Sequence, residues 1–219
     1  RFLILFEKGI SSQKGAVYRN KWSWVENEYP AVAAHLKPFQ KDAEKRYDKG
    51  DYWWELRACE YYQSFESDKI IFPDIAERPQ FTLDAEGGFY NANTCYNIFN
   101  SDTYLLGILN SRLINFYYRN VAAVYRGGYL RFFSQYVEAL PIRTIDFSDP
   151  ADAARHDRMV ALVEAMLDLN RRLADARTEQ DKTFIRREIE AADRRIDALV
   201  YELYGLSEEE IGLIEQAVQ

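Results

Sequence analysis

Apolar positions in the last third of the chain repeat with the period of an α-helix in two separate stretches. From Met159 to Leu173 and from Ile185 to Leu203, apolar residues recur three and four positions apart. This spacing is typical of a helix that buries one stripe of side chains, as in a coiled coil. The two stretches are out of register with each other, so we predict a break within residues 177–182 and a hairpin of two helices.

Local signals mark the end of this hairpin. Gly205 suits the left-handed conformation that ends a helix after Tyr204. Ser207 and Glu210 have the spacing of a capping box, in which each side chain accepts a hydrogen bond from the backbone N–H of the other residue. The sequence therefore predicts a third, short helix after Ser207.

The first two thirds of the chain contain short apolar runs. Phe2–Phe6 and Lys69–Ile75 have the length and the branched residues of strands. Residues 81–83 and 89–99 flank Glu86-Gly87-Gly88, a turn sequence that predicts a hairpin between them.

Two helical stretches lie among these strands. One covers Pro30–Tyr47, where Pro38 must kink or split the helix. The other covers Thr103–Arg119, and Asp102 is placed to cap it. Together the patterns predict an α+β fold, a mixed α/β domain followed by a C-terminal helical hairpin with coiled-coil-like spacing.

Charge divides the chain at the same place as the hydrophobic pattern. Residues 1–148 hold 18 Lys and Arg against 18 Asp and Glu, whereas residues 149–219 hold 10 against 17 and carry the whole net charge of −7. All but three of the 33 aromatic residues lie in the first part. We therefore expect two domains, 1–148 and 149–219, and we expect the acidic face of the second to stay away from DNA.

Several function classes are excluded by what the sequence lacks. No apolar run is long enough to span a membrane, and the short apolar start is no secretory signal, which favours a cytoplasmic protein without membrane contact. The two cysteines and two histidines do not have the spacing of metal ligands. Neither a Gly-rich cofactor turn nor a Pro-Pro-aromatic methyltransferase motif occurs, and Pro73-Asp74 lacks the rest of a nuclease motif. We expect no catalytic residue, metal or cofactor in this chain.

One stretch is distinctly positive. Between Leu105 and Arg143 there are five arginines and a single acid, Glu138. Residues 125–132, YRGGYLRF, interleave arginines and aromatics around two glycines. Arginine forks bind phosphates or guanine edges, and glycine permits close approach of the backbone. The alternative is an ordinary glycine turn with solvated arginines.

Two other segments have two interpretations. Trp53-Trp54, followed by Arg57, either anchors a core or forms part of a binding surface. Lys69 either contacts a phosphate or marks the start of a strand.

Sequence blocks along nearly the whole chain follow a familiar order. They read "YPAVAAHLKPF", "KGDYWWELRACEYYQSFESDKIIFPDI", "FYNANTCYNI", "LLGILNSRLINFYYR", "RGGYLRFFSQYVEALPI" and "IDALVYELYGL" with "EEEI". This succession resembles the TaqI-like C-terminal specificity domain. That domain is the target-recognition module of adenine-N6 DNA methyltransferases, including the single-chain restriction-modification enzymes called type IIG.

The resemblance implies that this chain reads DNA while other domains carry out the chemistry. A methyltransferase domain with its S-adenosylmethionine pocket, and any nuclease domain with Mg²⁺, would lie N-terminal to Arg1, which fits a sequence that does not start with Met. The implied partners are double-stranded DNA and that N-terminal domain. The helical pair would act as a spacer and docking surface, and its heptads leave a homo-oligomer open.

The resemblance, combined with local charge, implies six DNA-binding residues. Lys69, Arg126 and Arg131 are the first choice for contacts to phosphates or base edges. Arg57, Asn93 and Tyr129 are the second, and Asn93 could pair with adenine from the major groove.

Two alternatives from other classes remain open. The chain could be a complete nuclease or methyltransferase, or a protein-interaction module that docks through its C-terminal helices without touching DNA. A third possibility is a phage-exclusion methyltransferase that uses the same module without a nuclease. It would belong to a different defence system but carry out the same methylation chemistry.

Overall fold

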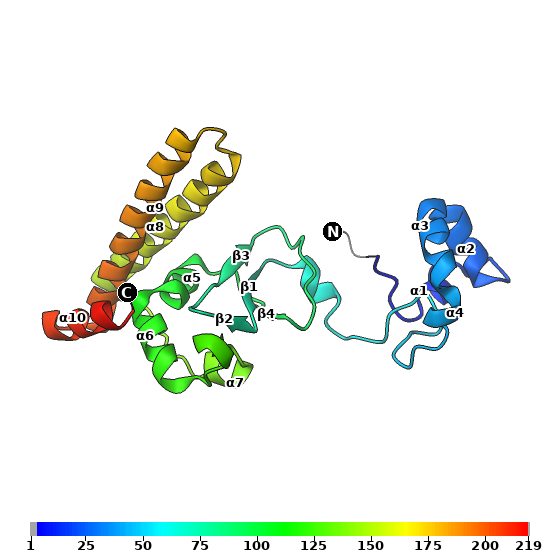
Figure 1. Cartoon of the computed structure of the whole chain (residues 1–219), viewed down its shortest axis with the longest axis horizontal. Coiled ribbons are helices and arrows are strands. Elements are labelled where there is room, and N and C mark those ends of the chain that lie inside the picture. The colour runs from blue at the N-terminus through cyan, green and yellow to red at the C-terminus, as the bar shows by residue number, and fades with distance from the viewer. Residues whose placement is uncertain (1–3, 219) are drawn as a thin grey trace. The chain divides into compact units, whose positions relative to one another are not determined.

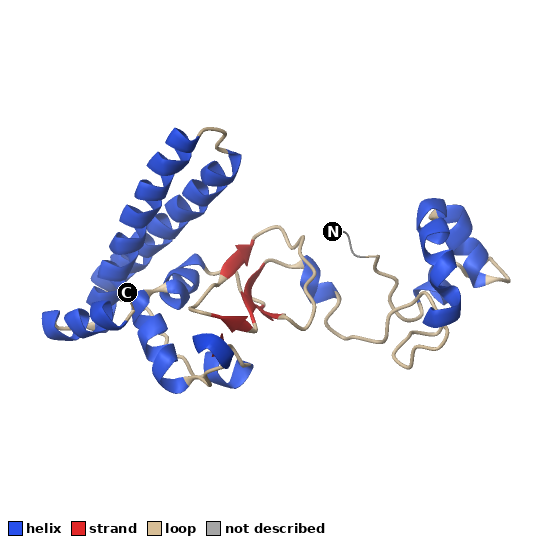
Figure 2. Cartoon of the chain, in the orientation of Figure 1, coloured by secondary structure: helices blue, strands red, loops and turns tan. Residues whose placement is uncertain are grey.

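The computed structural model describes residues 4–218 and has the α+β fold that the sequence predicted (Figures 1 and 2). The chain divides into two compact units, Arg1–Ser64 and Phe65–Gln219. The C-terminal helices share the hydrophobic core of the second unit. The expected division at residue 148, between a recognition part and a helical spacer, stays a prediction about function.

Buried tryptophans form the core of the first unit. Trp22 packs against Trp53 and Trp54, with ring centroids 4.7 and 5.0 Å apart. These rings bury a large apolar area, so Trp53-Trp54 is a core anchor and not a binding surface. The helices around this core are α1 (Ile10–Lys14), α2 (Lys21–Glu28), α3 (Pro30–Leu36), η1 (Lys37–Phe39) and α4 (Gln40–Ala43).

The helix predicted over Pro30–Tyr47 is split at the expected proline. Pro38 lies in the 3₁₀ turn η1, which separates α3 from α4, and the helical segment ends at Ala43. The strand predicted over Phe2–Phe6 is wrong for residues 4–6, which are irregular. Phe2 and Leu3 lie outside the described residues.

Two small antiparallel sheets begin the second unit. β1 (Lys69–Pro73) is the central strand of the first sheet and pairs with both β3 (Thr82–Asp84) and β4 (Cys95–Ile98). β3 and β4 therefore do not pair with each other, and the hairpin predicted for residues 81–99 is wrong. The second sheet joins β2 (Ile75–Ala76) to β5 (Leu130–Arg131), and the 3₁₀ turn η2 (Gln63–Glu66) precedes β1.

The helix predicted over Thr103–Arg119 is in fact two helices. Asp102 caps α5 (Thr103–Asn110) as expected. Ser111 then leaves the helical conformation, and its hydroxyl accepts a hydrogen bond from the N–H of Ile114. Ser111 thus starts a second helix, α6 (Arg112–Val121). The last short elements before the hairpin are η3 (Arg126–Gly128) and α7 (Ser134–Val137).

The C-terminal helices match their sequence signals closely. α8 (Pro150–Asp175) and α9 (Glu179–Tyr204) lie side by side as a hairpin, joined by residues 176–178 (Figure 1). Gly205, with φ of 63°, ends α9, and the capping box of Ser207 and Glu210 starts α10 (Glu208–Ala217). The α8 and α9 stripes contribute Met159, Leu162 and Leu199 to the core that α5 and α6 also enter.

Among residues 4–218, no helix combines the length and the apolar character that a membrane crossing requires.

Candidate nucleic-acid interface

The positive stretch 105–143 contains a tight turn, residues 125–129, with two glycines at its centre. The N–H of Tyr125 donates to the carbonyl of Tyr129 at 2.7 Å and closes the turn. Gly127 and Gly128 have φ of 79° and 83°, a left-handed conformation that residues with a Cβ rarely adopt. The turn therefore depends on both glycines.

Buried aromatic rings hold the strand that follows the turn. Phe132 is buried, and the ring of Tyr118 stacks on it with centroids 4.4 Å apart. The hydroxyl of Tyr118 donates to the carbonyl of Arg131 at 2.9 Å. Burial raises the pKa of this hydroxyl, which keeps it protonated and able to donate. The residues that follow the turn, Arg131 and Phe132, are thus held in place by Tyr118.

The side chains at the turn are exposed. Val124 is 67% exposed, Tyr125 46% and Tyr129 39%, and Arg126 is also exposed. Within the described part of the chain, no carboxylate lies within 4.0 Å of the Arg126 guanidinium. We call these four residues the Gly-turn surface. It places one unpaired cation among three apolar or aromatic side chains.

Arg131 lies beside this surface but is already engaged. Its Nε and Nη2 donate to the two carboxylate oxygens of Asp74 at 3.2 and 2.9 Å. The guanidinium carbon is 4.4 Å from the ring centroid of Phe133 and 5.6 Å from that of Tyr125. Arg131 lies in β5 and Asp74 directly precedes β2, so the two bonds hold these paired strands together and keep the guanidinium near the Tyr125 ring. Arg131 and Arg126 are thus close along the chain, but the guanidinium of Arg131 is paired with Asp74, whereas that of Arg126 has no carboxylate partner among the described residues.

The structure corrects the expectation for Lys69. Its side chain is fully buried, and Nζ donates to Asp84 at 2.5 Å and to the carbonyl of Phe65 at 2.6 Å. A buried ammonium needs such partners, because an isolated charge in the protein interior is very costly. Lys69 therefore stabilises the sheet in this fold and does not face a phosphate.

Arg57 and Asn93 are both exposed, but they lie in different units. Asn93 lies in the loop between β3 and β4, inside a turn that the Cys95 N–H closes onto the carbonyl of Ala92. Arg57 follows the Trp53-Trp54 anchor of the first unit. Their roles in DNA binding stay predictions, as do those of Arg126, Tyr129 and Arg131.

Arg119 was not among the residues that the sequence implied for DNA binding. This exposed residue, at the end of α6, donates to the side chain of Asn115 and to the carbonyl of Glu77. Arg119 thus holds the residues after β2 to α6. The available signal was its place among the five arginines of the positive stretch.

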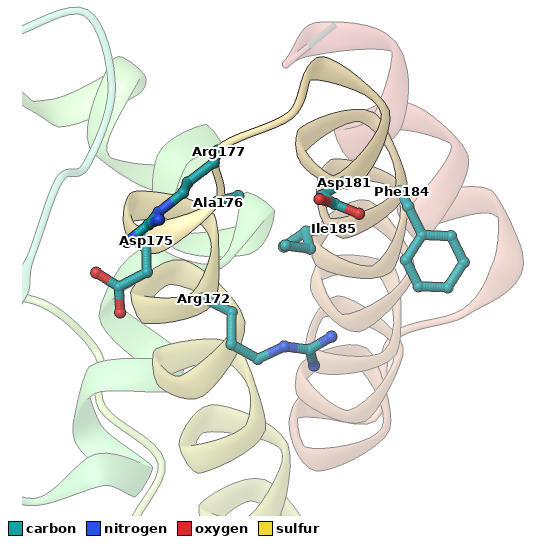
Figure 3. A pocket seen from close by; sticks show the side chains of 7 residues that line it. All are labelled: Arg172, Asp175, Ala176, Arg177, Asp181, Phe184 and Ile185. Carbon is teal, nitrogen blue, oxygen red and sulfur yellow. The ribbon is translucent and has the colours of Figure 1, made fainter.

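Two cavities lie away from the Gly-turn surface. One, of about 470 Å³, is at the tip of the α8–α9 hairpin. Figure 3 shows Arg172 reaching from α8 toward α9, while the ring of Phe184 points outward from α9. The other, of about 610 Å³, lies between α6, α9 and α10 and is lined by Arg112, Asp197 and Glu215 among others. Neither contains a residue that the sequence predicted for DNA binding.

Across residues 4–218, no group of three His, Cys, Asp or Glu side chains is placed to hold a metal ion.

Residues 7–142 match the TaqI-like C-terminal specificity domain, which is more than half of the chain. The chain therefore belongs to this family, and the domain serves DNA recognition in a TaqI-like enzyme without being catalytic itself. No curated protein matches the chain.

Proposed function

We propose that this chain is the sequence-reading part of an adenine-N6 DNA methyltransferase of the type IIG restriction-modification class. It holds the duplex beside the target while a separate catalytic domain flips out and methylates the adenine. The cost of flipping is then met only at the correct site. S-adenosylmethionine, and Mg²⁺ where the enzyme also cleaves, belong to those other domains, and the enzyme works in the cytoplasm on DNA.

The Gly-turn surface, in a chain of the specificity family, is the observation that carries this proposal. Arg126 supplies an exposed guanidinium without an ion-pair partner among the described residues, and Tyr125 and Tyr129 of the same turn expose their aromatic rings. The two glycines let the backbone come close to a groove wall. An arginine fork on such a turn suits a phosphate or the O6 and N7 edge of guanine.

The charge distribution indicates that binding by the chain alone is weak. The whole chain carries a net charge of −7, and Asp74 and Glu77 lie next to Arg131 and Arg119. The salt-dependent attraction to phosphates must therefore come largely from the catalytic domain. This chain would contribute the choice of site.

The proposal is tested with Arg126→Glu in the full enzyme and in the 219-residue chain. We expect this variant to lose DNA affinity and site preference, measured by fluorescence anisotropy with target and scrambled duplexes. Arg195→Glu, which makes the same charge change at an exposed position of α9 that lines neither cavity, is the matched control and should change neither. If both variants keep target preference, the Gly-turn surface does not read DNA.

We also propose that the tip of the α8–α9 hairpin docks onto the catalytic domain. Phe184 is 60% exposed there and lines the cavity of Figure 3, so a partner that fills the cavity would also cover its ring. Phe184→Asp should weaken the activity of the full enzyme while the isolated chain keeps its thermal stability. A change in the oligomeric state of the isolated chain would instead assign the tip to contact between copies.

A further inference from the structure

The longest stretch of the first unit without an acid surrounds an exposed loop. From residue 8 to residue 25 there are four cations and no Asp or Glu. Lys14 and Arg19 are exposed, and Val17 between them is 90% exposed. We call residues 14–21 the basic loop. An apolar tip between two cations is the kind of surface that follows a nucleic-acid backbone.

The basic loop is fixed on the tryptophan core. Gly15 lies so close to Trp24 that an added Cβ would be 2.9 Å from the Cβ of Trp24. The ammonium of Lys21 donates to the carbonyls of Gly15, Ala16 and Tyr18 at 3.0, 3.3 and 2.7 Å. These three hydrogen bonds from Lys21 stabilise one conformation of the loop backbone. A loop already held in one conformation loses little entropy when it binds a partner.

The helix that leads into the basic loop, α1, is fixed by separate hydrogen bonds. The buried carboxylate of Glu55 accepts hydrogen bonds from the N–H groups of Gly9 and Ser11 at 3.2 and 3.0 Å. The hydroxyl of Ser11 accepts a bond from the indole of Trp54 at 2.8 Å. These bonds attach α1, which ends at Lys14, to the core of the unit.

The two exposed cations are free of acidic neighbours. In the described range 4–218, no carboxylate lies within ion-pair distance of Lys14 or Arg19. Two other cations of the same unit do have acidic partners: Lys8 pairs with Asp51 at 3.6 Å and Lys45 with Asp42 at 3.2 Å. Lys14 and Arg19 are therefore available to phosphates, and each phosphate they neutralise would release counterions.

We propose that the basic loop is a second duplex-DNA contact, at which Lys14 and Arg19 bind backbone phosphates and Val17 lies against the sugars. The inference rests on the proposed function, because it gives the same DNA a second, sequence-independent contact. The Gly-turn surface reads the site, and the basic loop adds affinity wherever the duplex lies. The ligand is the phosphate backbone of a duplex and not a particular base.

The test uses the 219-residue chain and measures duplex affinity by anisotropy across a series of KCl concentrations. Lys14→Ala/Arg19→Ala should lower affinity equally for target and scrambled duplexes. It should also reduce the slope of log K against log salt by about 1.8, or about 0.9 for each phosphate lost. The control is Lys41→Ala/Lys45→Ala, which removes the same charge from exposed positions on the same unit.

A second pair of variants avoids any change in the number of cations. Val17→Asp places a carboxylate at the tip of the basic loop and should weaken binding. Tyr47→Asp places one at a fully exposed position of the same unit and should not. Thermal unfolding of all variants should match that of the parent, because these side chains make no core contact.

The outcomes separate this inference from the proposed function. If the loop variants keep the full salt slope while Arg126→Glu loses site preference, the second contact is refuted and the proposed function stands. Equal effects of the loop variants and their controls would also refute the second contact, because charge alone would explain them. If the parent shows no salt-dependent duplex binding even at low ionic strength, both proposals fail.

Discussion

Lys69 and Asp84 form a buried ion pair between register partners on neighbouring strands. The ammonium lies 2.5 Å from one carboxylate oxygen of Asp84, and the two side chains are 0% and 3% exposed. The same carboxylate accepts hydrogen bonds from the N–H groups of Gly88 and Phe89. The pair therefore joins β1 and β3 to the loop that follows β3.

Asp84→Asn should destabilise the chain strongly, because it leaves the Lys69 ammonium buried without a counter-charge. Removal of one partner of a buried pair typically costs roughly 3–5 kcal/mol. Urea unfolding followed by circular dichroism measures this loss. Asp42→Asn, which removes an exposed ion pair with Lys45, is the control and should change little. Similar midpoints for the two variants would contradict the structural role of the buried pair.

The same pair gives a pH dependence of known sign. Burial acts to raise the pKa of Asp84, but the bonds from Lys69, Phe89 and Gly88 outweigh it and lower the pKa below that of an ordinary aspartate. The stabilisation is therefore present above the unfolded pKa and is lost as the pH falls through the lower folded value. The free energy of unfolding of Asp84→Asn, measured by urea unfolding at several acidic pH values, should fall less as the pH is lowered than that of the parent.

Short-range signals predicted the helix boundaries well. Gly205, Ser207 and Glu210 act within a few residues of one another, so their geometry follows from the local sequence. Pro38 likewise acts on the backbone next to it. Ser111 uses the same capping chemistry, but its apolar neighbours continue the helical period and hide the break between α5 and α6.

Long-range pairing is where the sequence was misleading. Whether Lys69 is exposed or buried depends on Asp84, which is 15 residues away and on another strand. Residues 81–99 have the pattern of a hairpin, yet both strands pair with β1, which precedes them. For the candidate site, the glycine turn and its arginines were visible in the sequence. The pairing of Arg131 with Asp74, across 57 residues, was not.

Arg131→Lys should disturb the Gly-turn surface although it keeps the charge. Lysine cannot make the two parallel bonds to Asp74 or stack its head group on Phe133. We expect faster hydrogen exchange of the Phe132 N–H, which donates to the carbonyl of Asp74 at 2.8 Å, and weaker binding of the target duplex. Arg126→Lys is the control and should leave this exchange rate unchanged. Unaltered exchange in Arg131→Lys would show that the fork does not hold the turn.

Asp197 gives a second pH dependence of opposite sign. It lies between α6, α9 and α10, where it accepts a bond from the N–H of Arg112 at 2.8 Å, and Arg112 also pairs with Glu215. Burial, with a smaller contribution from Asp193, raises the pKa of Asp197 to about 6, although Arg112 lowers it. The folded chain thus binds this proton more tightly than the unfolded chain. Stability is lost as the pH rises from about 4 to about 6.

Asp197→Asn should remove this contribution. The difference in unfolding free energy between the variant and the parent should change by on the order of 2–3 kcal/mol between pH 4 and pH 7, in favour of the variant at the higher pH. Urea unfolding at several pH values measures it. A constant difference across this range would mean that Asp197 has the pKa of an ordinary aspartate in the folded chain.

The contact between α5 and α8 leaves no room for a side chain at Gly107, and this makes a clear prediction about the hairpin. An added Cβ would lie 2.7 Å from Sδ of Met159 and 2.9 Å from Cγ2 of Val163, both on α8. Gly107→Ala should therefore force the helices apart at a cost of roughly 1–3 kcal/mol. Gly212→Ala in α10, where nothing lies within 4 Å of the new Cβ, is the matched control. Alanine is the better helix former, so this control should gain roughly 0.5–1 kcal/mol. Thermal unfolding of the two variants should shift in opposite directions, and a stabilising Gly107→Ala would show that α8 does not approach α5 this closely.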